Sequence, residues 1–216
     1  MLPQRISWER LAGLTAVGFV GLYVVAFALG IEVGASDREI LEHYADSGNR
    51  VQEAVAFFLI AAAALALVLF AGALRGLIAR AERETAMLAA LAWAGGIAAA
   101  VLVLVGNAVS RATAFIAMSD EFVLDPNTRR LVDQAGFLIF VSGAFAAILL
   151  VAATSLAALR YGVLPRWLGW AGIPAAALLA VPFLGFLVFV AWMLTVGAVL
   201  ALGRAPRDGP RPVADS

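Results

Sequence analysis

The chain has 216 residues, of which 63% are hydrophobic and only 14% are charged, and its mean hydropathy is +0.96. Average soluble domains are nearer half apolar and a quarter charged, and disordered chains are less hydrophobic still, so this composition excludes both classes. Fifteen basic and fifteen acidic residues cancel to a formal net charge of zero. The absence of Cys excludes thiolate chemistry, and a single His, His43, excludes multi-histidine metal sites. We therefore expect neither a metal site nor a cofactor.

Long apolar segments recur along the chain and predict an all-α fold, a polytopic transmembrane helical bundle. Each of the first four is close to the roughly 20 residues that cross the hydrocarbon core as a helix: residues 11–31, 51–74, 87–109 and 135–159. The last apolar stretch contains Pro182 and is too long for one span, so we expect two short spans, 167–181 and 183–202, joined by a tight turn. This gives six spans; one long kinked helix, which gives five, is the alternative.

The distribution of Arg along the chain predicts which side each loop faces. With six spans and the N-terminus inside, ten of the fifteen Arg fall on the cytoplasmic side and ten of the fifteen carboxylates on the outer side. Basic residues are enriched in cytoplasmic loops, whereas five spans would move the Arg-rich tail outside. We expect residues 1–204 to form the bundle and the Pro-rich residues 205–216 to form a disordered cytoplasmic tail, with both termini in the cytoplasm.

Both outer loops carry helix-start signals. In the first loop, Ser36 and Glu39 have the spacing of a capping box, an apolar stripe follows over residues 40–44, and Gly48 provides a C-terminal stop. We therefore expect a short amphipathic helix on the outer surface. In the second loop, Asp125-Pro126 fits the N-cap and first position of the next helix.

Polar residues of the spans gather at their outer ends. Ionisable groups at membrane depth usually face the bundle interior and pair with one another, so we expect Arg111 to oppose Glu53 or Asp133 in a polar pocket open to the outside. The candidate ligand-binding residues are Glu32, Gln52, Asn107, Arg111 and Gln134, with Phe57 and Phe137 as apolar contacts. The alternative, favoured for Glu32, Arg50 and Arg130, places these groups at headgroup level, where charge costs little.

Asn107 and His43 receive separate predictions. Asn107 lies a full turn inside its span, so we expect an interhelical hydrogen bond to Gln134 or Gln52. His43 belongs to the first outer loop, and we expect it to be a solvated residue rather than a catalyst.

Two functions fit these residues, and the sequence leaves open whether the protein is an enzyme. The first is a non-catalytic protein that binds a lipid, an apolar small molecule or a membrane-protein partner; its helix surfaces permit a homo-oligomer, and we expect no nucleic-acid partner. The second is an enzyme such as an acid-initiated isoprenoid cyclase, in which Glu53 or Asp133 protonates the substrate. Aromatic rings would then stabilise a carbocation, unless they simply face lipid: Phe57, Phe58, Phe137, Phe140 and Trp93.

The run from Leu156 to Trp170, LAALRYGVLPRWLGW, and the acidic helix-forming loop after the first span carry a resemblance. Together they resemble a group of small polytopic membrane proteins of high-GC bacteria that is catalogued as a domain of unknown function. Fifteen Arg without a single Lys are compatible with such a genome. The resemblance implies six spans in a bacterial cytoplasmic membrane and implies no reaction.

Overall fold

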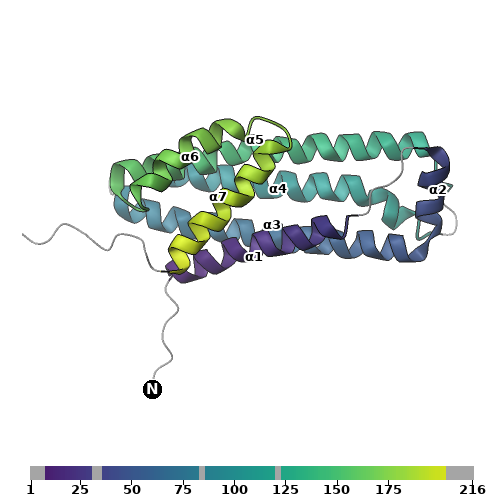
Figure 1. Ribbon diagram of the computed structural model, residues 1–216, viewed down its shortest axis with the longest axis horizontal. Helices are drawn as coiled ribbons and strands as arrows, with labels where there is room; N and C mark the ends of the chain where they lie inside the picture. Colours follow the sequence, from purple (N-terminus) through teal and green to yellow (C-terminus); the bar gives the residue numbers. More distant parts are fainter. Residues whose placement is uncertain (1–7, 31–35, 83–85, 120–122, 203–216) are drawn as a thin grey trace, which may run out of the picture.

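The structure is a computed structural model that describes residues 8–30, 36–82, 86–119 and 123–202 (Figure 1). This part of the chain holds seven helices and no strand: α1 (Trp8–Ala28), α2 (Asp37–Ala45), α3 (Ser47–Glu82), α4 (Met87–Ile116), α5 (Pro126–Tyr161), α6 (Arg166–Leu178) and α7 (Leu184–Ala201). Glu32 and the expected disordered tail, residues 205–216, lie outside the described residues.

Five of the described helices, α1, α3, α4, α5 and α7, are long and apolar enough to cross a membrane, so the chain is a multi-pass membrane protein. The expected break at Pro182 is present, because α6 ends at Leu178 and α7 begins at Leu184. However, α6 has only 13 residues, about 20 Å at 1.5 Å per residue, which is shorter than the hydrocarbon core of about 30 Å. The sixth span therefore stays a prediction.

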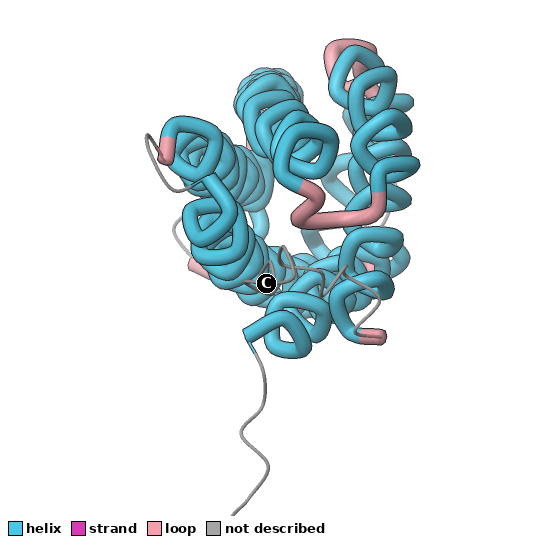
Figure 2. The backbone as a smooth tube through the Cα atoms, turned by 90° about the vertical axis from the view of Figure 1, so that its left-hand side faces the viewer, coloured by secondary structure: helices cyan, strands magenta, loops and turns pink. Residues whose placement is uncertain are grey.

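The four helices α1, α3, α4 and α5 run side by side, and α2 lies across one end of them (Figure 1). We call this the α2 end. At the opposite end, α6 and α7 form a hairpin that covers the bundle over about half its length, and Figure 2 views the helices from this hairpin end. Gly169 of α6 packs on Leu159 of α5, and Gly197 of α7 packs on Ala16 of α1. The hairpin tip, residues 179–183, consequently lies partway along the bundle and leaves α1 and α5 uncovered towards the α2 end.

Helices α4 and α5 approach each other through glycines. A Cβ at Gly106 would lie 2.7 Å from the carbonyl oxygen of Gly136 and 2.7 Å from the amide nitrogen of Phe140, and a Cβ at Gly95 would lie 2.6 Å from the amide nitrogen of Leu150. Only glycine allows two helix backbones to pack this closely. The contact at Gly106 holds α4 against α5 next to Asn107 and Arg111 of α4.

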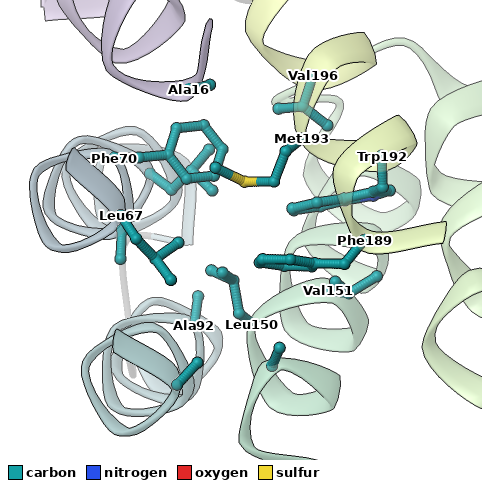
Figure 3. Packing of buried hydrophobic residues seen from close by; sticks show 14 of the residues in the cluster. Ala16, Leu67, Phe70, Ala92, Leu150, Val151, Phe189, Trp192, Met193 and Val196 are labelled. Atoms are coloured by element: carbon teal, nitrogen blue, oxygen red, sulfur yellow. The ribbon is translucent and has the colours of Figure 1, made fainter. Parts of the chain in front are cut away.

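The hairpin half of the bundle is filled by an apolar core (Figure 3). Met193 of α7 reaches to the Phe70 ring of α3, and Leu150 of α5 lies below them; all three are buried (Figure 3). The rings of Phe189 and Trp192 stack at a centroid distance of 6.3 Å. This half of the protein is a packed hydrophobic core, and the buried polar side chains described in it include Glu82, Thr154 and Ser155.

The helix-start signals are confirmed, while the stop at Gly48 is wrong. Ser36 and Glu39 form both hydrogen bonds of a capping box at α2, and the Asp125 side chain accepts hydrogen bonds from the first turn of α5. Helix α2 ends at Ala45, and Gly48 lies inside α3, where its N–H donates to Asp46 Oδ1 at 2.7 Å. Helices α3 and α5 extend well beyond the expected spans because an apolar run marks only the part of a helix that contacts hydrocarbon.

Candidate functional site

A buried carboxylate, Glu53, lies at the centre of the α2 end and is only 3% exposed. Its Oε1 is hydrogen-bonded to Nε2 of His43 at 2.9 Å, and its Oε2 accepts a long hydrogen bond from the Tyr44 hydroxyl at 3.4 Å. The guanidinium of Arg111 lies 3.9 Å from the same Oε2. Because these residues come from α2, α3 and α4, the carboxylate ties three helices together.

A buried guanidinium, Arg129 of α5, extends this network to a fourth helix. Its Nε donates to the Tyr44 hydroxyl at 2.6 Å, its Nη1 forms an ion pair with Asp133 at 3.0 Å, and its guanidinium lies 5.5 Å from the centre of the Tyr44 ring. Burial and the neighbouring Glu53 carboxylate raise the pKa of Tyr44. The phenol therefore stays neutral, accepting from Arg129 and donating to Glu53.

Two more arginines hold α2 against the bundle. Arg50 donates to the carbonyl oxygen of Tyr44 at 2.7 Å, and Arg130 forms an ion pair with Asp37 at 2.7 Å. His43 is only 8% exposed, so its predicted position as a solvated residue is wrong. The physical reason is its spacing: His43 and Tyr44 share one face of α2 with the buried Ile40, and that face docks on the network.

Asn107 faces the bundle interior but has different partners from those predicted. Its Nδ2 donates to the carbonyl oxygen of Phe57 at 3.2 Å, and its Oδ1 accepts from Nε of Arg111 at 3.2 Å. The predicted bonds to Gln134 and Gln52 are therefore wrong. Gln52 instead donates to the carbonyl oxygen of Leu29 at 3.0 Å.

A cavity of about 810 Å³ lies beside the network, between α1, α4, α5 and the hairpin tip. Its volume falls in the range of about 300–1,000 Å³ that is usual for small-molecule sites. One wall is polar and includes Glu53, Asn107, Ser110, Arg111, Asp133 and Gln134. The other walls are apolar and include Phe137, Phe140, Val141, Phe186, Leu187 and Val190.

The mouth of the cavity lies on the helix flanks, and aromatic rings close its inner end. Several of its lining residues are exposed on the flanks of α1 and α5 and at the hairpin tip, and these mark its mouth; among them are Val24, Phe27, Phe137 and Phe183. At the inner end, the rings of Tyr23 and Phe186 approach to a centroid distance of 4.5 Å, and Phe140 lies 6.2 Å from Tyr23 and 6.0 Å from Phe186. The mouth therefore lies on the helix flanks, beside exposed apolar side chains.

The structure brings most, though not all, of the candidate residues together. Six of them line the cavity: Glu53, Asn107, Arg111, Asp133, Gln134 and Phe137. Gln52 and Phe57 do not, and Phe57 packs on Phe58 and Phe115 instead. Of the aromatic residues considered for a cyclase, Phe140 lines the cavity, whereas Trp93 lies against Arg75, 5.9 Å away.

Five residues of the network and the cavity were not among the predicted site residues, namely Tyr23, His43, Tyr44, Ser110 and Arg129. The face shared by Ile40, His43 and Tyr44 was a usable signal for α2. Tyr23 lies in a largely apolar helix, and nothing in the sequence indicates which helices surround it. In the part of the chain that the structure describes, no group of three or more His, Cys, Asp or Glu could hold a metal ion.

No protein-family model, curated protein or solved structure matches the chain. The resemblance to small polytopic membrane proteins of high-GC bacteria therefore stays a prediction.

Proposed function

We propose that this multi-pass membrane protein binds a lipophilic molecule from the bilayer in the cavity between α1 and α5. The observation that carries the proposal is a cavity of about 810 Å³ with apolar walls, one polar wall and a mouth on the helix flanks. Exposed apolar groups at the mouth would contact acyl chains in a membrane. A ligand with an apolar body and a polar end matches both kinds of wall.

The depth of the two walls supports the same proposal. Arg111 follows the apolar run of α4, and Asp133 precedes the apolar run of α5, so the polar wall lies at the boundary of the apolar part of the bundle. The Phe140 and Phe186 rings lie deeper, beside the hairpin tip. An amphiphile would hold its polar end at this boundary and its chain among the aromatic rings.

We propose that the cavity faces the extracytoplasmic leaflet. Ten of the fifteen Arg belong to the sequence segments that flank the hairpin end, which the positive-inside rule assigns to the cytoplasm. The α2 end, and with it the mouth of the cavity, would then lie on the opposite side of a bacterial cytoplasmic membrane.

The cyclase alternative finds less support in this geometry. Both carboxylate oxygens of Glu53 already have partners, His43 on one and Tyr44 with Arg111 on the other, so neither is left to protonate a substrate. The Asp133 side chain is 57% exposed and paired with Arg129. A proton donor for carbocation chemistry needs a free acid group aimed into an enclosed apolar cavity.

Filling the cavity tests the proposal. Ala144 of α5 lines the cavity, whereas Ala152 of the same helix is exposed on the bundle surface. We expect Ala144→Trp to remove a lipophilic molecule that copurifies with the wild type, and Ala152→Trp to retain it, as measured by mass spectrometry of extracts from matched amounts of purified protein. Equal lipid content and composition in the two variants and the wild type would refute the proposed function.

A further inference from the structure

Arg111 is a cationic donor at the cavity with unused hydrogen-bonding capacity. Its guanidinium carries five N–H groups, and among the described residues only its Nε has a hydrogen-bond acceptor, the side chain of Asn107. Its Nη1 lies 3.9 Å from Glu53, beyond hydrogen-bonding distance. The side chain lines the cavity, so its terminal nitrogens are available to a ligand there.

Tyr23 is a further donor. It lines the inner end of the cavity, is only 7% exposed and lies within electrostatic reach of Arg111. No described residue forms a hydrogen bond with its hydroxyl, and this hydroxyl is not one of the fully buried atoms without a partner, so it can donate to a ligand in the cavity. A ligand oxygen in the cavity would supply the missing acceptor for Tyr23 and for the terminal nitrogens of Arg111.

The carboxylates around the cavity leave this cation incompletely paired. Glu53 forms its hydrogen bonds with His43 and Tyr44, and Asp133 pairs with Arg129. A cationic headgroup would be repelled by Arg111, and a neutral alcohol would add an oxygen without a charge. A carboxylate or phosphate supplies several oxygens and the opposite charge, and such charge-assisted bonds to Arg are about twice as strong as neutral ones.

We infer that the occupant of the cavity is an anionic lipid whose oxyanion headgroup, a carboxylate or a phosphate, binds Arg111 and Tyr23. This inference rests on the proposed function and names the chemical class of its ligand. The headgroup lies between Arg111 on the polar wall and Tyr23, and the chain follows the Phe140 and Phe186 rings towards the mouth between α1 and α5. Arg111 thereby selects the lipid by charge, while the apolar walls accept its chain.

The test compares lipids that differ only in headgroup. The full-length protein is placed in nanodiscs of neutral phosphatidylcholine at alkaline pH, so that carboxyl groups are ionised, and the probes are palmitate, hexadecyl phosphate, hexadecanol and hexadecylamine. We expect the two anions to bind at least about tenfold more tightly than hexadecanol, and hexadecylamine to bind most weakly. The ratio between palmitate and hexadecyl phosphate decides which oxyanion is preferred.

Variants then assign the selectivity to individual side chains. Arg111→Gln should abolish most of the preference for anions, Tyr23→Phe should reduce it several-fold, and Arg75→Gln, a control at the hairpin end, should leave it intact. Arg111→Lys keeps the charge and should retain part of the preference even if Arg111→Gln fails to fold.

Equal binding of palmitate and hexadecanol by the wild type would overturn the inference, as would an undiminished anion preference in folded Arg111→Gln. If hexadecanol binds as well as palmitate and Ala144→Trp blocks both, the proposed function stands and the anion selectivity fails. If no probe binds and Ala144→Trp leaves the lipid content unchanged, the proposed function itself fails.

Discussion

Replacing Tyr44 by Phe removes one hydroxyl from the centre of the network and leaves the ring in place. The hydroxyl accepts a hydrogen bond from Arg129 at 2.6 Å and donates one to Glu53 at 3.4 Å. The first is short, buried and charge-assisted, whereas the second is near the limit of hydrogen-bonding distance and adds little. A buried hydrogen bond to a charged group contributes about 1.5–3 kcal/mol. We therefore expect α2 to detach about 30-fold more often in Tyr44→Phe, which corresponds to about 2 kcal/mol.

Hydrogen exchange of the α2 amides, followed by mass spectrometry in nanodiscs, measures this detachment directly. The matched control is Tyr161→Phe, because Tyr161 is exposed at the end of α5 and its hydroxyl has no partner among the described residues. Exchange over residues 37–45 should accelerate in Tyr44→Phe and remain at the wild-type rate in Tyr161→Phe. Unchanged exchange of α2 in Tyr44→Phe would show that the network does not hold this helix.

The other predictions concern packing, pH and topology. A Cβ at Gly106 would lie 2.7 Å from the α5 backbone, whereas a Cβ at Gly76 would have no atom within 4 Å. Gly106→Leu should therefore abolish the thermal unfolding transition of the wild type, and the control Gly76→Ala should preserve it. A Gly106→Leu protein that unfolds at the wild-type temperature would contradict the α4–α5 packing. Hydrogen bonds from the side chain and backbone of Thr128 lower the pKa of Asp125. The stabilisation of α5 by this cap is therefore fully present above the pKa that Asp125 has in the unfolded chain. It is lost as the pH falls through the lower pKa that Asp125 has in the folded protein. Amide signals of the first turn of α5 should show fraying in acid, and Asp125→Ala should show it at neutral pH too; an acid-insensitive first turn in the wild type would contradict this. Because the chain has no Cys, an introduced Cys is its single reactive thiol. With the α2 end outside, Glu42→Cys should react with an impermeant maleimide in intact cells, and Arg80→Cys should react only after permeabilisation. The reverse pattern would refute the orientation.

The helices could largely be predicted from the sequence, because apolar runs, a capping box and the Asp125-Pro126 pair act locally. Their ends could not, since α3 begins at Ser47, where the Asp46 side chain binds the N–H of Gly48 and the helix continues through the expected stop. The short length of α6 also escaped prediction. Hydropathy shows that residues 167–181 are apolar, but it does not show that the helix stops at Leu178.

The candidate site was predicted in outline rather than in its contacts. The polar residues at the ends of the spans indicated a shared pocket, and Glu53, Asn107 and Arg111 do line one cavity. The partners depend on tertiary geometry: His43 reaches Glu53 only because α2 folds back onto α3, and the Arg129–Tyr44 bond joins residues 85 positions apart. The cavity itself arises because the α6–α7 hairpin stops partway along the bundle, which no local pattern reports.

The proposed function requires a bilayer lipid in the cavity between α1 and α5. Photo-crosslinking with a diazirine-bearing palmitate in vesicles, followed by peptide mapping, tests it most directly. We predict saturable labelling of Phe137, Phe140, Ala144 and Phe186, which excess unlabelled palmitate and Ala144→Trp both suppress. Labelling that instead falls on the exposed residues Leu65 and Leu69 of α3 and does not saturate would contradict the proposed function.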